Sequence, residues 1–106
     1  MNENSWFVTA QGDNAALSVS KAAEVGARHV ITAFYAGFDG AAVKGTMTLL
    51  GPGGVAMAAL HFTGQISMDG LNIEFAGNVG AVVGITLTAS GAAGTFGSVL
   101  LNGYTK

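Results

Sequence analysis

The feature of this sequence that most limits its fold is a series of short segments in which apolar and polar residues alternate. Glycine-containing turns separate the segments about every 10–12 residues, which is typical of the strands of a sandwich or barrel. Alternation over about four to eight residues indicates a β-strand with one buried face. No helical pattern alternates with these segments, which disfavours a parallel α/β sheet. The series therefore predicts an all-β chain of eight or nine strands.

Two segments illustrate the residue types that predict strands. Residues 28–38 are rich in β-branched and aromatic residues, which suit a pleated, half-buried surface. Residues 55–63 contain good helix formers, but a helix this short between two glycines is marginal, so a strand is the better interpretation. Residues 65–68 lead into a turn at Asp69-Gly70. The expected strands are 5–10, 15–21, 28–38, 43–50, 55–63, 71–75, 81–89 and 95–104.

The fold class that these strands predict is an antiparallel β-sandwich of about eight strands with a jelly-roll-like arrangement. An immunoglobulin-like sandwich is the alternative, although the chain has one tryptophan and no cysteine pair. At 106 residues we expect a single domain over residues 1–106, with a short N-terminal tail at residues 1–5.

Charged residues are rare. They make up 9% of the chain, against about a quarter in an average protein, whereas Gly and Ala together make up about a third. A folded monomer of this mass exposes roughly 5,500 Å², and so few charged side chains cannot dominate that surface. Large uncharged surfaces are typical of proteins that pack against other subunits. We therefore expect a homo-oligomer or a subunit of a larger assembly.

Composition also excludes several classes of protein. A net charge of −2 argues against a nucleic-acid binder, which would carry a basic face. The absence of cysteine excludes a disulfide scaffold and a thiolate metal site. The most apolar window, residues 79–89, is far shorter than the ~20 residues of a membrane-spanning helix. The first five residues lack the basic start of a signal peptide, so we expect neither a membrane protein nor an exported one.

Candidate catalytic and metal-binding residues are few. His29 and His61 lie inside expected strands beside Val30 and Phe62, where a histidine is more often structural than catalytic, and no nucleophile motif accompanies them. Asp13, Asp39 and Asp69 precede or occupy glycine turns, in which aspartate bonds the backbone. No segment resembles a calcium loop. We expect no catalytic residue, no metal and no cofactor.

Aromatic residues offer another kind of site. The phenylalanines are best interpreted as core, because sugar-stacking platforms favour Trp and Tyr. Trp6 and Phe7 follow a polar N-terminal segment, and Tyr104 lies close to the other end of the sequence. These three residues are the candidate subunit-interface residues. A carbohydrate- or receptor-binding module remains the alternative, and it would need exposed Trp and Tyr side chains in one concave site.

Several segments resemble small structural proteins of tailed-bacteriophage heads. They are ARHVITAF at 27–34, GNVG at 77–80, LTASGAAGTFG at 87–97 and NGYT at 102–105, whereas residues 51–68 depart from the pattern. Capsid decoration (cement) proteins of this kind have jelly-roll-like sandwiches and carry no catalytic residues. The resemblance implies a protein that is made in the host bacterial cytoplasm. It also implies that the protein binds the major capsid protein lattice of the virion as a dimer or trimer.

These observations lead to two expectations for function. The first is a capsid decoration protein that stabilises the shell, because few charged residues suit a protein that binds the virion over broad, mostly uncharged surfaces. The second is a carbohydrate- or receptor-binding β-sandwich module of a phage tail fibre.

Overall fold

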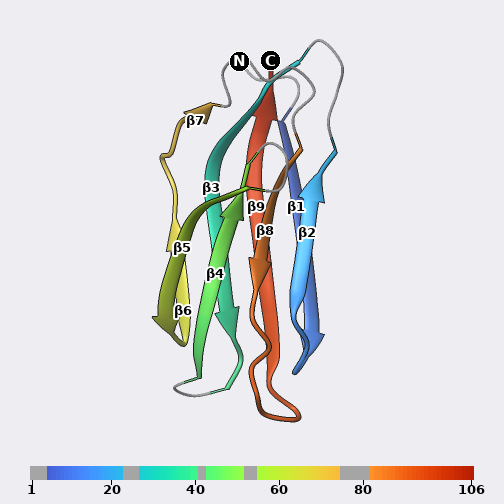
Figure 1. The fold of residues 1–106 in the computed structure, drawn as a ribbon, viewed down its shortest axis with the longest axis vertical. Coiled ribbons are helices and arrows are strands. Elements are labelled where there is room, and N and C mark those ends of the chain that lie inside the picture. The colour runs from blue at the N-terminus through green and yellow to red at the C-terminus, as the bar shows by residue number, and fades with distance from the viewer. Residues whose placement is uncertain (1–4, 23–26, 41–42, 52–54, 75–81) are drawn as a thin grey trace.

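Two antiparallel β-sheets pack face to face in the computed structural model, which describes residues 5–22, 27–40, 43–51, 55–74 and 82–106 (Figure 1). None of these residues forms a helix that is long and apolar enough to cross a membrane. The all-β sandwich that the sequence predicts is confirmed. The strands are β1 (Ser5–Asp13), β2 (Leu17–Lys21), β3 (His29–Phe38), β4 (Lys44–Leu50), β5 (Ala56–Thr63), β6 (Gln65–Met68), β7 (Ile73–Glu74), β8 (Val83–Leu87) and β9 (Phe96–Thr105).

The strand order is that of a jelly roll. One sheet has five strands, in the order β1-β9-β3-β6 with β7 also paired to β3, and the other has four, in the order β2-β8-β4-β5. Because β6 and β7 pair with different stretches of β3, they act as one interrupted strand, which makes eight in effect. Consecutive strands belong to different sheets at six connections: β1 to β2, β2 to β3, β3 to β4, β5 to β6, β7 to β8 and β8 to β9. This alternation is the arrangement of jelly rolls.

The core lies between the sheets and consists of the inward-facing residues of both. Strand β9 shows the alternation clearly, since Val99 and Leu101 are fully buried while Leu100 between them lies on the outer face. Strands β3 and β8 are the most buried because each lies inside its sheet. The core cluster comprises Leu17, Ile31, Phe34, Ala36, Phe38, Met47, Leu49, Val83, Ile85, Leu87, Val99 and Leu101.

Some strand boundaries differ from those expected. Strand β1 continues through Gly12 and Asp13, because both residues pair with β9, and the chain turns only at Asn14, whose φ is 46°. The strand expected at 71–75 begins only at Ile73 and is described to Glu74, because Phe75 lies outside the described residues. Ser5 belongs to β1 rather than to a tail, and residues 1–4 lie outside the described residues.

The prediction that the phenylalanines form the core is wrong for Phe96, whereas Phe7 was expected at an interface. Phe34 and Phe38 are buried, and Phe38 stacks on Phe62 with ring centroids 5.8 Å apart. Phe7 and Phe96 are 64% and 46% exposed. Both lie at outward positions of the five-stranded sheet, where alternation along the strand overrides the apolar character of the side chain.

Acidic and amide side chains hold the loop that precedes β9. Asp13 Oδ1 accepts a hydrogen bond from the backbone N–H of Gly94 at 2.7 Å, and Asp39 Oδ1 accepts one from Phe96 at 2.7 Å. Asn14 Oδ1 accepts another from the backbone N–H of Gly91. Asp13 and Asp39 therefore do bond backbone groups, but these groups belong to Gly94 and Phe96, which are distant in sequence.

Candidate functional site

The three predicted interface residues lie at one end of the five-stranded sheet. Strands β1 and β9 pair with Ser5 opposite Tyr104, Trp6 opposite Gly103 and Phe7 opposite Asn102. Alternation then separates the three residues, because Trp6 faces the core while Phe7 and Tyr104 face outward. Nothing in the structure tests whether they contact another chain.

Trp6 lies at the end of the sandwich where β1 begins and β9 ends. Its Nε1 donates a hydrogen bond to Thr105 Oγ1 at 3.1 Å, and its ring meets His29 edge to face, with centroids 5.7 Å apart. The indole also packs over Gly103, where an added Cβ would collide with both the indole and the carbonyl of Val30. Only glycine allows this approach. These contacts hold the indole within the fold, so Phe7 and Tyr104 are the two members that face outward.

The outward residues around Phe7 and Tyr104 form a surface that we call the aromatic face. In the ladders, Leu100 lies between Thr9 and Tyr35, and Asn102 lies between Phe7 and Ala33. None of its residues is charged. Sequence reasoning missed Tyr35, although its alternation with the buried Phe34 and Ala36 would have placed it outward. The aromatic face comprises Phe7, Thr9, Ala33, Tyr35, Leu100, Asn102 and Tyr104.

The aromatic face has a hollow of about 190 Å³ at its β3–β6 side. A β-bulge between Ile31 and Ala33 precedes it on β3, and such bulges redirect side chains next to binding sites. Tyr35 is the one tyrosine in the hollow, whereas Trp6 faces the core. The exposed Trp and Tyr cluster that a sugar platform would need is therefore not assembled by the described residues. The lining residues are Ala33, Phe34, Tyr35, Ser67, Met68, Asp69 and Leu100.

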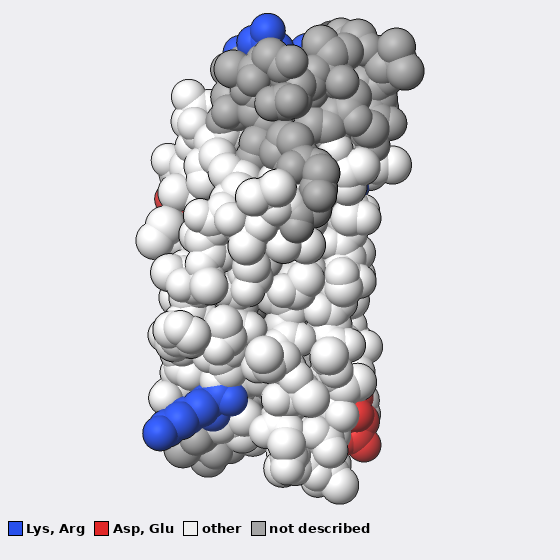
Figure 2. Space-filling model, in the orientation of Figure 1, with Lys and Arg blue, Asp and Glu red and all other residues white. Residues whose placement is uncertain are grey.

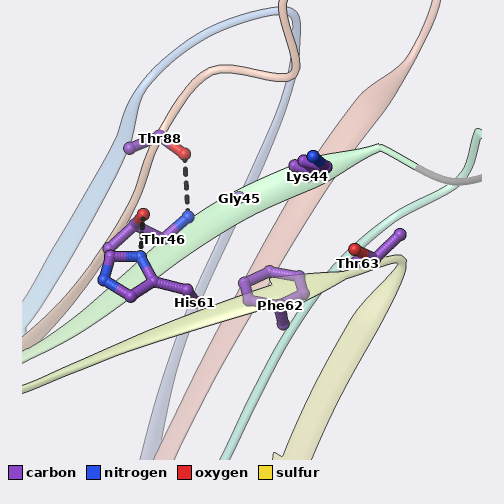
Figure 3. Close-up of a pocket in the computed structure, with 7 residues that line it drawn as sticks. All are labelled: Lys44, Gly45, Thr46, His61, Phe62, Thr63 and Thr88. Atoms are coloured by element: carbon purple, nitrogen blue, oxygen red, sulfur yellow. Dashed lines mark hydrogen bonds between the residues drawn. The ribbon is translucent and has the colours of Figure 1, made fainter.

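A second hollow, of about 390 Å³, lies on the outer face of the four-stranded sheet (Figure 3). His61 on β5 lies opposite Thr46 on β4, and its Nδ1 is 2.8 Å from the Thr46 hydroxyl. The Thr46 backbone N–H donates to the hydroxyl of Thr88 at 3.1 Å. The residues that line the hollow are Lys44, Gly45, Thr46, His61, Phe62, Thr63 and Thr88.

An exposed imidazole beside a hydroxyl is the first requirement of a nucleophilic enzyme. Such a site also needs a third group that orients the base and donors that stabilise the oxyanion. No carboxylate is among the residues that line this hollow. The contact of His61 with Thr46 follows from their cross-strand register alone. That the protein is not an enzyme stays a prediction.

His29 is a buried structural histidine. It is 1% exposed, with Nδ1 2.9 Å from Thr105 Oγ1 and Nε2 2.8 Å from the carbonyl oxygen of Ala22. Because a carbonyl only accepts, we assign the proton to Nε2, so that Nδ1 accepts from the hydroxyl of Thr105. The Trp6 indole then donates to that hydroxyl, and among the described residues no buried side-chain nitrogen or oxygen lacks a partner. Among the described residues, no group of three or more His, Cys, Asp or Glu could hold a metal ion.

Among the described residues, charged side chains occur at the ends of strands or directly beside them. Of the ten charged residues, Glu3 and Glu24 lie outside the described residues, and the remaining eight each end a strand, begin one or lie directly beside one. Figure 2 shows the result for the four-stranded sheet, whose broad surface is white with coloured atoms at its ends and margins. The eight are Asp13, Lys21, Arg28, Asp39, Lys44, Asp69, Glu74 and Lys106.

Comparisons with known proteins add little to this geometry. No protein-family model and no curated protein matches the chain. One solved structure, from work titled "Bacillus endospore appendages form a novel family of disulfide-linked pili", is 14% identical. The match covers 99% of this chain and 93% of that chain, with a TM-score of 0.34. A likeness of this size carries no argument, and the fold follows from the strand order alone.

Proposed function

We propose that this protein is a capsid decoration protein, a structural subunit that binds the major capsid protein lattice of a bacteriophage head and stabilises the shell. The observation that carries the proposal is the placement of the described charged residues at or beside strand ends, which leaves most of both broad faces of the sandwich uncharged. The resemblance of residues 27–34 and 87–97 to phage head proteins supports the choice of a capsid as the partner. The protein would then be made in the bacterial cytoplasm and reside on the virion surface.

An uncharged face suits a protein that must cover a large area of a partner. Burying a charge is costly unless it is paired, so a face without charges loses less free energy on contact. The resulting contact also depends little on salt, because salt screens mainly exposed charges.

The aromatic face is the surface that we assign to the shell. Tyr and Phe are enriched at interfaces, where large aromatic side chains in well-packed pockets supply much of the binding free energy. Phe7 is 64% exposed and therefore available as such an anchor. Tyr104 lies on the neighbouring strand β9, and Tyr35 lies on β3, the next strand of the same sheet.

Electron microscopy of the parent particle with and without this protein tests the proposal. We expect sandwich-shaped density on the outer surface that is lost when the protein is removed, together with a shell that resists heat and osmotic shock less well. A shell that stays equally resistant and loses no surface density would contradict the proposal.

Two matched variants test the assigned face by rebinding to stripped particles. Phe7→Ser should weaken binding at least tenfold, whereas Val55→Ser, also at a 64% exposed residue but directly before β5 of the other sheet, should bind like the natural chain. Equal binding of the two variants would remove the aromatic face from the proposal. Binding to glycans on an array, without binding to stripped particles, would favour the tail-fibre alternative.

A further inference from the structure

The two sheets have four edge strands, and they differ in how well they are protected against pairing with another chain. Natural edges are kept short or carry charges, because a long uncharged edge pairs with other strands. Strand β2 has five residues and ends at Lys21, and the β6–β7 edge is interrupted. Strand β1 ends at Asp13 and packs beside β2. Strand β5 is neither short nor charged: it has eight residues, none of them Asp, Glu, Lys or Arg. A bulge at Met57 is the one irregularity in its pairing.

The free edge of β5 presents unpaired backbone groups. The Gly64 N–H donates to the Val43 carbonyl at 2.8 Å, which makes Gly64 and Val43 a hydrogen-bonded pair at the end of the β4–β5 ladder. Such pairs alternate along an antiparallel ladder, so the even-numbered residues of β5 bond β4. The N–H and C=O groups of Ala59, His61 and Thr63 therefore point away from the sheet.

The side chains of β5 are complementary to a second copy of the same strand. Ala58 and Ala59 precede Leu60, and His61 and Phe62 follow it. In an antiparallel pair with its twofold axis at Leu60, each large ring lies opposite an alanine of the other copy. Phe62 faces Ala58 on the core side, and His61 faces Ala59 on the outer side. Contacts of this kind between directly opposed residues stabilise a sheet.

We propose that two copies of this chain pair through β5, antiparallel about Leu60, so that the two four-stranded sheets become one continuous sheet. The pair closes on itself, since the same strand serves both copies. The proposal does not rest on capsid binding, because β5 and the aromatic face belong to different sheets. A protein that fails to bind a shell can still form this pair.

Proline at the free edge tests the pairing. Ala59→Pro removes an N–H that β4 does not use, so the single chain should fold while the pair is lost. Gln11→Pro is the matched control, because Asn14 donates to the carbonyl of Thr95 and the same alternation therefore points the Gln11 N–H away from β9. Sedimentation over a range of concentrations should show that the natural chain and Gln11→Pro double in mass while Ala59→Pro does not.

Three outcomes would overturn the proposal: a natural chain that keeps the mass of one chain, an Ala59→Pro variant that still pairs, or a Gln11→Pro variant that no longer does. If Ala59→Pro does not fold, Ala59→Lys replaces it, since an edge lysine also blocks pairing. Amide hydrogen exchange gives an independent measurement. The Ala59 and His61 amides should exchange at least tenfold more slowly as concentration rises, with no change at Gln11. Unchanged exchange at all three amides would overturn the pairing.

Discussion

The two histidines make similar contacts but face opposite ways. His29 points to the core from the five-stranded sheet, and His61 points to solvent from the four-stranded sheet. Each lies opposite a threonine on the neighbouring strand, His29 opposite Thr105 and His61 opposite Thr46. In each pair Nδ1 lies within 2.9 Å of the threonine hydroxyl. His29 faces the core and is 1% exposed, whereas His61 faces solvent. The same His–Thr contact is therefore part of the buried packing at one end of the sandwich in the first case and lines a solvent-exposed hollow in the second.

The difference shows that burial, rather than hydrogen-bond geometry, determines what such a pair contributes to stability. A buried polar atom that loses its partner keeps the cost of desolvation, whereas an exposed one finds water. Substitution of each member of each pair in turn tests this difference. Stability is measured at concentrations where the chain is a single copy, so that pairing through β5 does not contribute.

His29→Ala should have the largest effect, a loss of about 3 kcal/mol in the free energy of unfolding. The substitution leaves a cavity beside Trp6 and removes the partners of Thr105 and of the Ala22 carbonyl. Chemical unfolding followed by the fluorescence of Trp6, the one tryptophan in the chain, measures the loss directly at this end. A loss below about 1 kcal/mol would show that this end is not tightly packed.

Thr105→Val should cost about 2 kcal/mol, because it leaves the Trp6 indole N–H and the His29 Nδ1 buried without partners while the side chain keeps its shape. The control is Thr105→Ser, which keeps the hydroxyl and should cost about half as much or less. Equal losses in the two variants would show that the methyl group, and not the hydroxyl, is what matters.

His61→Ala should cost about 0.5 kcal/mol, the usual size of a cross-strand contact on a solvent-exposed face. Thermal unfolding by circular dichroism is sufficient to measure it beside His29→Ala. A cost as large as that of His29→Ala would remove the distinction between the two faces.

Thr46→Val should have the smallest effect, with the free energy of unfolding within about 0.5 kcal/mol of the natural chain. Water replaces the hydroxyl as the partner of His61, and valine suits a strand at least as well as threonine does. The informative quantity is the loss in the free energy of unfolding divided by the loss for Thr105→Val, both measured in the same denaturant series. We expect this ratio to be below about one quarter.

Alternation along the strands was sufficient to predict most of the fold. It placed Val83, Ile85 and Leu87 on one face, and all three are buried. The shortness of the segment between two glycines favoured a strand over a helix at 55–63, where β5 lies. Alternation could not predict strand order, because it says which face a residue occupies and nothing about its neighbours. The extension of β1 through Asp13 depends on β9, some 80 residues away in sequence, and this ladder overrides the local turn preference.

The candidate sites were less predictable than the fold. Phe7 and Tyr104 are outward as an interface requires, but the inward position of Trp6 depends on the space above Gly103. The exposure of His61 depends on which face of β5 meets the core. The alternating Ala, Leu and Phe residues of β5 determine that face only when β5 is paired with β4.

The position of β9 has a consequence for how the chain is made. Strand β9 is the last strand in chain order, yet it lies between β1 and β3 in the five-stranded sheet. During translation β1 and β3 must therefore wait without their shared neighbour until β9 has left the ribosome. Pairing between such distant segments is slow, and unpaired strands are prone to aggregate in the meantime. We expect that the sandwich closes only after β9 is released, so that chaperones would act on this chain before then.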